Sequence, residues 1–218
     1  MTDGQKLVGI FSYINEVPTV NLFVCKAVTP TCFTQVNIVD EALKVISLQT
    51  IIGTIENMKQ STSSKKTQMN QLYAIDIVKM ATIHIKYMNF KLAMEKFPKI
   101  KCEKLRGHLM NLCALNGLTY LQEYSSIGYE CGYFKKGTLS LINEAVKILL
   151  IALRPQLIPL IEMVPMTDNM LMSAIGNSYG DIYETHLEWA KTSRLNDDKG
   201  SIPIGFKEYI FPILQGKL

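Results

Sequence analysis

The sequence of this 218-residue chain predicts an all-α protein, a helical bundle preceded by a short irregular N-terminal segment. Apolar residues recur at helical spacing over most of the chain, and residues that end helices, such as Pro98, separate the periodic stretches. Beyond the first thirty residues, which are ambiguous, nothing signals a pair of strands. With 48% hydrophobic and 19% charged residues, the composition is typical of a compact globular protein. We therefore expect apolar helical stripes to be buried against one another.

The first part of the chain is expected to contain one helix after an irregular start. Residues 1–36 include Pro18 and Pro30 and show no sustained helical period, so loop and extended chain are predicted there. From Asn37 to Met58 apolar residues return near helical spacing, which predicts a helix that Asn37 could cap.

A polar stretch then separates this helix from the rest. Residues 60–67, with the sequence QSTSSKKT, are small, polar and basic, as is typical of an exposed linker. We place a domain boundary here, so that residues 1–60 belong to one part and residues 61–218 to another.

Three longer helices are predicted after the linker. Gln68–Phe97 carries a broad apolar face and is stopped by Pro98, and Ile100–Tyr124 repeats the pattern with regularly spaced leucines. The stretch 127–137 is rich in glycine and aromatic residues, which favours a loop. Leu139–Leu153 forms the third of these helices.

Sharply placed helix breakers and caps follow. Arg154-Pro155 ends one apolar helix, Thr167 can cap the next, and Gly176 closes it. Gly180-Asp181 then opens a further helix that is expected to end near Ser193.

The order and spacing of these breakers resemble the C-terminal helical domain of peroxisomal acyl-CoA oxidases. In that family the sequence has, in order, R-P, an apolar segment, a short helix ending in Gly, then D/N-G-x-V-Y-E, W-A and S-P-L-N. This chain supplies Tyr183-Glu184, Trp189-Ala190 and Leu195-Asn196 at the matching places. It departs at Arg194, where the family usually has proline. We expect Tyr183, Glu184 and Trp189 to pack the last helix against the bundle.

The resemblance implies a fold, a reaction and a compartment. The family uses FAD to oxidise fatty acyl-CoA to trans-2-enoyl-CoA with release of hydrogen peroxide, in peroxisomal fatty acid β-oxidation. The resemblance covers the last third of a subunit, so residues 61–218 would be its C-terminal helical domain and residues 1–60 a remnant of its flavin-proximal helical domain. Most flavin contacts would then lie outside this chain, and we do not expect the chain alone to bind FAD. The terminus Gly216-Lys217-Leu218 is one residue from the peroxisomal address Ser-Lys-Leu.

The same resemblance predicts that the catalytic base is lost. In the family the base is a glutamate in a stretch like T-P-x-C-T-[FY]-E-G-[DE]-N-x-V, and the matching stretch here, Thr29–Val39, is one residue short and places Gln35 at the glutamate. A glutamine amide is not basic near neutral pH, so the roughly 10² to 10⁴-fold contribution of a positioned base is lost. Asp40 and Glu41 are the next carboxylates, but they would lie a turn later, and we do not expect them to substitute.

A second family element is altered as well. Where the family has a Cys-Gly-Gly-His-Gly-Tyr turn that lines the active site, this chain has Leu7–Tyr13, which keeps one glycine and the final tyrosine of that turn. We therefore expect the chain alone to be an inactive relative of the oxidases. The alternative interpretation is a non-catalytic helical interaction module that pairs with oxidase subunits, as a homodimer or a heterodimer.

Other functions find less support in the sequence. The 23 basic residues are scattered among 19 acidic ones, which argues against a nucleic-acid surface despite the net charge of +4. Charged residues and prolines interrupt the most apolar run, Val146–Pro165, which argues against a membrane span. His84, His108 and His186 lie on three separate predicted helices, so no metal site is expected.

Overall fold

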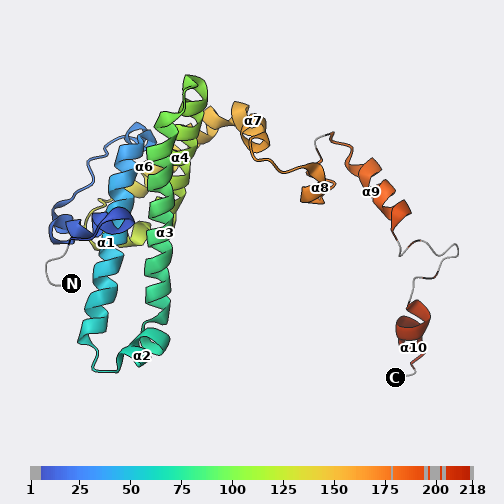
Figure 1. Ribbon diagram of the computed structural model, residues 1–218, viewed down its shortest axis with the longest axis horizontal. Coiled ribbons are helices and arrows are strands. Elements are labelled where there is room, and N and C mark those ends of the chain that lie inside the picture. Colours follow the sequence, from blue (N-terminus) through green and yellow to red (C-terminus); the bar gives the residue numbers. More distant parts are fainter. Residues whose placement is uncertain (1–5, 178, 194–195, 197–201, 203–204, 217–218) are drawn as a thin grey trace. The chain divides into compact units, whose positions relative to one another are not determined.

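The computed structural model describes residues 6–177, 179–193, 196, 202 and 205–216, and it confirms the all-α class (Figure 1). No strand occurs among these residues, and within the same ranges no helix is long and apolar enough to cross a bilayer. The chain divides into two compact units, Met1–Leu157 (unit 1) and Ile158–Leu218 (unit 2). The predictions made for Arg194, Leu195, Lys217 and Leu218 fall outside the described residues.

Four long helices make the bundle of unit 1, and each confirms a helix predicted from apolar periodicity. They are α1 (Val36–Gln60), α3 (Ala74–Lys96), α4 (Glu103–Glu123) and α6 (Thr138–Leu153). Helix α1 packs on both α3 and α4, and α4 also packs on α6. The fully buried side chains at their contacts are apolar: Val39, Ile46, Leu48, Phe90, Leu118, Leu121 and Ile142.

The segment before α1 differs from the predicted loop and extended chain. It contains two stretches of 3-10 helix, η1 (Gly9–Leu22) and η2 (Pro30–Thr34). Such turns are held by i to i+3 bonds and need no 3.6-residue apolar period, so periodicity does not reveal them. Asn37 is also not the cap of the first long helix, because α1 already begins at Val36, with Gln35 at the N-cap position and no side-chain cap bond.

The predicted linker is mostly exposed, as expected, and holds the three-residue helix α2 (Lys65–Thr67), capped by the Ser64 hydroxyl. A wider π-helical turn, Gln68–Leu72, follows, so α3 starts at Ala74 and is shorter than the predicted helix. The helices on the two sides of the linker pack on each other within unit 1. The two sides of the linker are thus part of one compact unit. That residues 1–60 and 61–218 belong to two different domains of the family stays a prediction.

The predicted loop 127–137 is partly helical. Helix α5 (Ser125–Glu130) occupies its start, and Tyr133 and Phe134 then turn into the core. Gly128 permits this turn, because a Cβ there would meet the Phe134 ring, with Cε2 at 2.6 Å. The backbone of Tyr133 accepts a 3.1 Å hydrogen bond from the Cys25 amide, which ties the segment before η2 to this turn.

Unit 2 is a string of short helices. They are α7 (Leu157–Glu162), α8 (Asp168–Leu171), α9 (Ile182–Thr192), the π-helical turn η7 (Phe206–Ile210) and α10 (Phe211–Leu214). The helix predicted to open at Gly180-Asp181 is confirmed as α9. The prediction that Gly176 closes the preceding helix is wrong, since α8 ends at Leu171 and Met172 takes the left-handed conformation, with φ 46°.

Unit 2 has almost no interior of its own. Among its described residues only Ala174 is buried. Tyr183, predicted to pack the last helix against the bundle, is 85% exposed, and Trp189 is 46% exposed.

Candidate functional site

The two segments that match altered elements of the family's catalytic centre, Gln35 and Leu7–Tyr13, lie apart in the structure. Gln35 is exposed at the start of α1, whereas Tyr13 is buried and its hydroxyl lies 2.8 Å from Ser47 Oγ. Ser47 follows Gln35 by twelve residues on the same helix, which at 1.5 Å per residue is about 18 Å along its axis. The structure therefore does not bring Gln35 and the Leu7–Tyr13 segment into one site. Whether Gln35 occupies the position of the family's base stays a prediction.

Tyr13 instead anchors η1 to two helices of the bundle. Its hydroxyl contacts Ser47 on α1 and Nδ1 of His84 on α3, each at 2.8 Å. Phe11 stacks on the His84 ring at a centroid distance of 5.2 Å, and Tyr13 meets Tyr87 edge-on at 4.9 Å. Burial raises the pKa of Tyr13, against the effect of the Ser47 hydrogen bond, and burial lowers the pKa of His84. Near neutral pH, both shifts favour the neutral form of the side chain.

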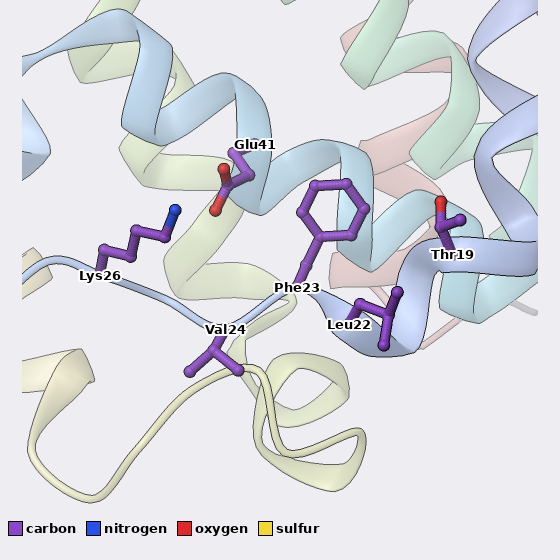
Figure 2. A pocket seen from close by; sticks show the side chains of 6 residues that line it. All are labelled: Thr19, Leu22, Phe23, Val24, Lys26 and Glu41. Carbon is purple, nitrogen blue, oxygen red and sulfur yellow. The ribbon is translucent and has the colours of Figure 1, made fainter.

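A pocket lies beside α1, where the end of η1 passes into extended chain (Figure 2). Its volume is about 290 Å³, and it is lined by Thr19, Leu22, Phe23, Val24, Lys26 and Glu41. Figure 2 shows the charged ends of Lys26 and Glu41 directed toward the same part of this pocket. The pocket thus combines an apolar wall with one cation and one carboxylate.

A hydrogen bond from a buried side chain holds the carboxylate of the pocket in place. Glu41 Oε1 accepts a 3.0 Å hydrogen bond from the hydroxyl of Tyr133, which is only 2% exposed. The Phe23 ring is held in turn by Lys44, whose ammonium lies 5.2 Å from the ring centroid and pairs with Glu16 at 2.8 Å. From the sequence alone, Glu41 is only a carboxylate one turn beyond Gln35. No local pattern links it to Tyr133, which lies 92 residues further along the chain.

Asp40, the other carboxylate considered, lies outside this pocket. Burial raises the pKa of its carboxyl group, while the nearby charges of Lys91 and Lys44 oppose that effect. Its Oδ1 and the buried hydroxyl of Tyr87 make no hydrogen bond of normal geometry, although Asp40 and Tyr87 are close enough for each to shift the pKa of the other. Asp40 is thus a carboxyl with a raised pKa, but it does not line the pocket where a substrate could reach it.

The pocket does not fit a flavin dinucleotide. About 290 Å³ corresponds to roughly ten water-sized groups at ~30 Å³ each. This is at the lower limit for a drug-sized ligand. Its one ammonium group, on Lys26, is matched by the carboxylate of Glu41, whereas a pyrophosphate needs an excess of donors and positive charge. No step of flavin chemistry can therefore be assigned to these residues.

The three histidines lie on three different helices. His84, His108 and His186 lie on α3, α4 and α9, respectively. Across the described part of the chain, no group of three or more His, Cys, Asp or Glu side chains is placed to hold a metal ion.

Comparison with known proteins identifies the family. The family model for acyl-CoA oxidase matches residues 35–215. The mouse (Mus musculus) peroxisomal acyl-coenzyme A oxidase 1 is 28% identical over 221 residues, which cover 99% of this chain and 33% of the mouse protein. The Dictyostelium discoideum protein of the same name is 42% identical over a shorter stretch of 66 residues, 30% of this chain and 9% of that protein. The chain thus spans about a third of the length of the curated relatives it matches.

Solved structures share the fold. Acyl-CoA oxidase 1 of Arabidopsis thaliana superposes with a TM-score of 0.83 at 22% identity, over 99% of this chain and 32% of that one. The tomato (Lycopersicon esculentum) acyl-CoA oxidase LeACX1 gives 0.83 at 25% identity, over 97% of this chain and 32% of that one. A Caenorhabditis elegans acyl-CoA oxidase-2, solved with FAD, ascaroside-CoA and ATP, gives 0.77 at 18% identity, over 97% and 30%. Because the family model covers most of the sequence and the same fold recurs in solved oxidases, this chain belongs to the acyl-CoA oxidase family.

Proposed function

We propose that this chain is the C-terminal helical part of an acyl-CoA oxidase-like protein. The activity of the whole protein is FAD-dependent oxidation of fatty acyl-CoA to trans-2-enoyl-CoA, with release of hydrogen peroxide, in peroxisomal fatty acid β-oxidation. The observation that carries this proposal is the match of the family model to residues 35–215. In this proposal residues 61–218 are the family's C-terminal domain, and residues 1–60 descend from its flavin-proximal helical domain.

Peroxisomal residence is part of the proposal. The mouse and rat relatives are named as peroxisomal enzymes. The C-terminal Gly216-Lys217-Leu218 would act as a weakened form of the Ser-Lys-Leu address.

The chain alone, in this proposal, does no oxidase chemistry. Flavin and acyl-CoA are bound chiefly by the parts of an oxidase subunit that these residues do not include. Two features support this view. The pocket beside α1 is too small for a flavin dinucleotide, and Gln35, exposed at the start of α1, has no group that can take a proton from Cα of an acyl thioester.

We expect the purified 218-residue chain, incubated with FAD and then gel-filtered, to show no flavin absorption in the visible range. Anaerobic addition of medium-chain or long-chain acyl-CoA should change nothing, because the pocket beside α1 is too small for a flavin dinucleotide and position 35 carries an amide instead of a carboxylate. The variant Gln35→Glu should behave in the same way, since its new carboxylate would lie exposed at a helix start. Retained flavin that bleaches on addition of acyl-CoA would contradict the inactive assignment.

A second candidate function is a non-catalytic interaction module. The exposure of large apolar side chains in unit 2 favours it. A segment of about sixty residues needs a substantial apolar core to be stable alone. Among the residues of unit 2 that the structure describes, only Ala174 is buried. The large apolar side chains of this unit face solvent instead, with exposures of 51–81% at Ile158, Ile161, Met163, Met166, Met170, Met172 and Ile175. Methionine-rich surfaces of this kind adapt readily to a partner. The partner proposed is an oxidase subunit, as a homodimer or a heterodimer.

We expect this module to form a complex with a full-length peroxisomal acyl-CoA oxidase, with the summed mass in size-exclusion chromatography with light scattering. Ile161→Glu should weaken the complex at least tenfold, because it places a charge in an apolar contact. Glu162→Lys, a charge change at the neighbouring exposed position, serves as the control and should have a much smaller effect. Separate elution of the two proteins at high micromolar concentration would rule out the interaction function while leaving the family assignment intact.

A further inference from the structure

The segment that joins α3 to α4 holds the excess positive charge of the chain. Its eleven residues, Lys96–Arg106, include five of the 23 basic residues and one of the 19 acidic ones, which leaves eighteen of each sign in the rest of the chain. Basic residues occur along the whole sequence, but outside this segment acidic residues balance them. Extending the segment back to Lys91 adds one basic residue and Glu95, so the excess stays the same. We call Lys96–Arg106 the basic tip.

The basic tip presents four lysines at one end of the bundle. They are the last residue of α3, the last residue of the 3-10 turn η4 (Phe97–Lys99), a residue of the following bend, and the second residue of α4: Lys96, Lys99, Lys101 and Lys104. All four side chains are exposed. Figure 1 shows this segment at the end of the bundle opposite α2. Because each lysine lies within one helical turn, about 5.4 Å, of that end, a flat surface touching the tip would lie within about one Debye length, ~10 Å, of all four.

The backbone beneath these lysines is held in place by contacts that leave their ammonium groups free. Arg106 Nη1 donates a 3.1 Å hydrogen bond to the Ile100 carbonyl, and the Ile100 amide donates one of 3.0 Å to the Phe97 carbonyl. The half-buried Phe97 ring packs against the core of unit 1. Within the described part of the chain, none of the four ammonium groups makes a hydrogen bond or an ion pair. The tip therefore displays unpaired charge on a fixed turn.

Helix stability explains only half of these lysines. Lys96 and Lys99 lie at the C-terminal end of α3, where the helix dipole favours a cation. Lys101 and Lys104 lie on the two sides of the N-cap of α4, where the dipole disfavours a cation, and no side chain caps this helix. These two lysines weaken the start of α4, so their position fits a partner that carries negative charge.

We propose that the basic tip binds the surface of an anionic phospholipid bilayer. A lysine ammonium is a point charge on a flexible stem, whereas a single phosphate group is held best by the rigid fork of an arginine. The arginine of the tip is engaged with the Ile100 carbonyl. Its aromatic residue, Phe97, packs against the core and does not offer an exposed ring on which a nucleic-acid base could stack. Exposed lysines at the end of a bundle are suited to a flat array of anionic headgroups.

The charges of the tip set the expected strength. Each lysine close to an anionic bilayer strengthens binding about fivefold, so four lysines strengthen it by several hundredfold. Glu103 opposes part of this attraction. Because Phe97 faces inward, the contact depends on charge rather than on insertion of an apolar side chain. We therefore expect weak, reversible binding that salt abolishes.

Co-sedimentation of the full 218-residue chain with lipid vesicles tests the proposal. The chain should bind vesicles of phosphatidylcholine with about 30% phosphatidylserine, and should bind pure phosphatidylcholine vesicles at least about a hundredfold more weakly. Raising the salt from about 50 to about 300 mM more than halves the Debye length and should remove most of the binding. Phosphatidylglycerol in place of phosphatidylserine should give equal binding, since the tip responds to charge and not to the structure of the headgroup.

The double variant Lys99→Glu/Lys101→Glu should lower the affinity for the anionic vesicles at least about twentyfold, because two attractive charges become repulsive. Lys65→Glu/Lys66→Glu is the matched control. It changes the net charge by the same amount at two exposed positions of α2, at the opposite end of the bundle. Its affinity should fall less than about threefold, since these charges lie far from the bilayer. Circular dichroism confirms that both variants are folded.

Four results would overturn the proposal. Equal losses in the two double variants would show that binding follows net charge and not the tip. Equal binding to both kinds of vesicle, insensitive to salt, would come from exposed apolar side chains such as those of unit 2. A preference of more than tenfold for phosphatidylserine over phosphatidylglycerol would indicate a structured headgroup site. Tighter binding to a single-stranded oligonucleotide, lost in the tip variant, would assign the tip to nucleic acid.

Discussion

Gly117→Leu is expected to destabilise unit 1 by about 3 kcal/mol or more, at or above the upper end of the usual cost of overpacking a core. Gly117 lies on α4 where α1 and α3 cross it. A Cβ at this position would lie 2.6 Å from Phe90 Cε2, and the Val39 Cγ1 atom is closer still. Val39 and Phe90 are both fully buried, so neither can move aside into solvent.

The smaller change Gly117→Ala should still cost about 1–3 kcal/mol, although alanine is the better helix former. Gly107, on the same helix, provides a matched control, since a Cβ there meets nothing within 4 Å. Gly107→Ala should therefore stabilise the protein by roughly 0.5–1 kcal/mol. Urea unfolding followed by circular dichroism measures both variants. Equal effects of the same sign would show that α4 does not approach its neighbours as closely as described.

Tyr13→Ala is the second change with a large expected effect, a loss of about 3–5 kcal/mol in the free energy of unfolding. The side chain is 2% exposed, and removing it leaves a cavity against Tyr87 and deprives Ser47 and His84 of their common partner. Tyr13→Phe separates the two contributions. It keeps the ring and should cost only about 1–3 kcal/mol, for the unsatisfied hydroxyl of buried Ser47. Similar losses for both variants would mean that the ring contributes little packing.

The same cluster should make stability depend on pH. Burial lowers the pKa of His84 in the folded protein below its ordinary value of about 6.5, so the unfolded chain binds more protons as the pH falls. This contribution to the free energy of unfolding is fully present above about pH 6.5. It is lost progressively as the pH falls toward the lowered pKa of the folded state. His84→Gln, which can still hydrogen-bond to Tyr13, should flatten the stability profile in this window; an unchanged profile would assign the dependence to other groups.

Long periodic helices were predictable from the sequence because many residues contribute to each. The helix predicted over Asn37–Met58 is α1, Val36–Gln60, and Pro98 ends α3 within two residues of the expected place. The short elements were not predictable. The 14 residues of η1 form 3-10 turns, which need no 3.6-residue apolar period, and the six residues of α5 are too few to show one. The shape of both depends on packing, against α1 and Phe134 respectively.

The positions of the site residues relative to one another were even less predictable from the sequence. Gln35 and Leu7–Tyr13 match two short motifs that lie near each other in the family's active site, but a motif match gives no distance between two segments. In the structure, several turns of α1 separate Gln35 from the Tyr13 hydroxyl. The contact between Glu41 and Tyr133 joins residues 92 positions apart, and no local pattern reveals it. The family resemblance, by contrast, depends on many ordered positions, and the family model confirms it.

The exposed apolar surface of unit 2 has a consequence for the life of this protein in a cell. Chaperones and proteases recognise solvent-exposed apolar segments, and they sort proteins by how long such segments stay uncovered. The described residues of unit 2 bury only Ala174, so folding of this unit alone does not hide its exposed apolar side chains. The abundance of the chain should therefore follow the supply of a partner surface that covers side chains such as Ile158, Met172 and Ile175.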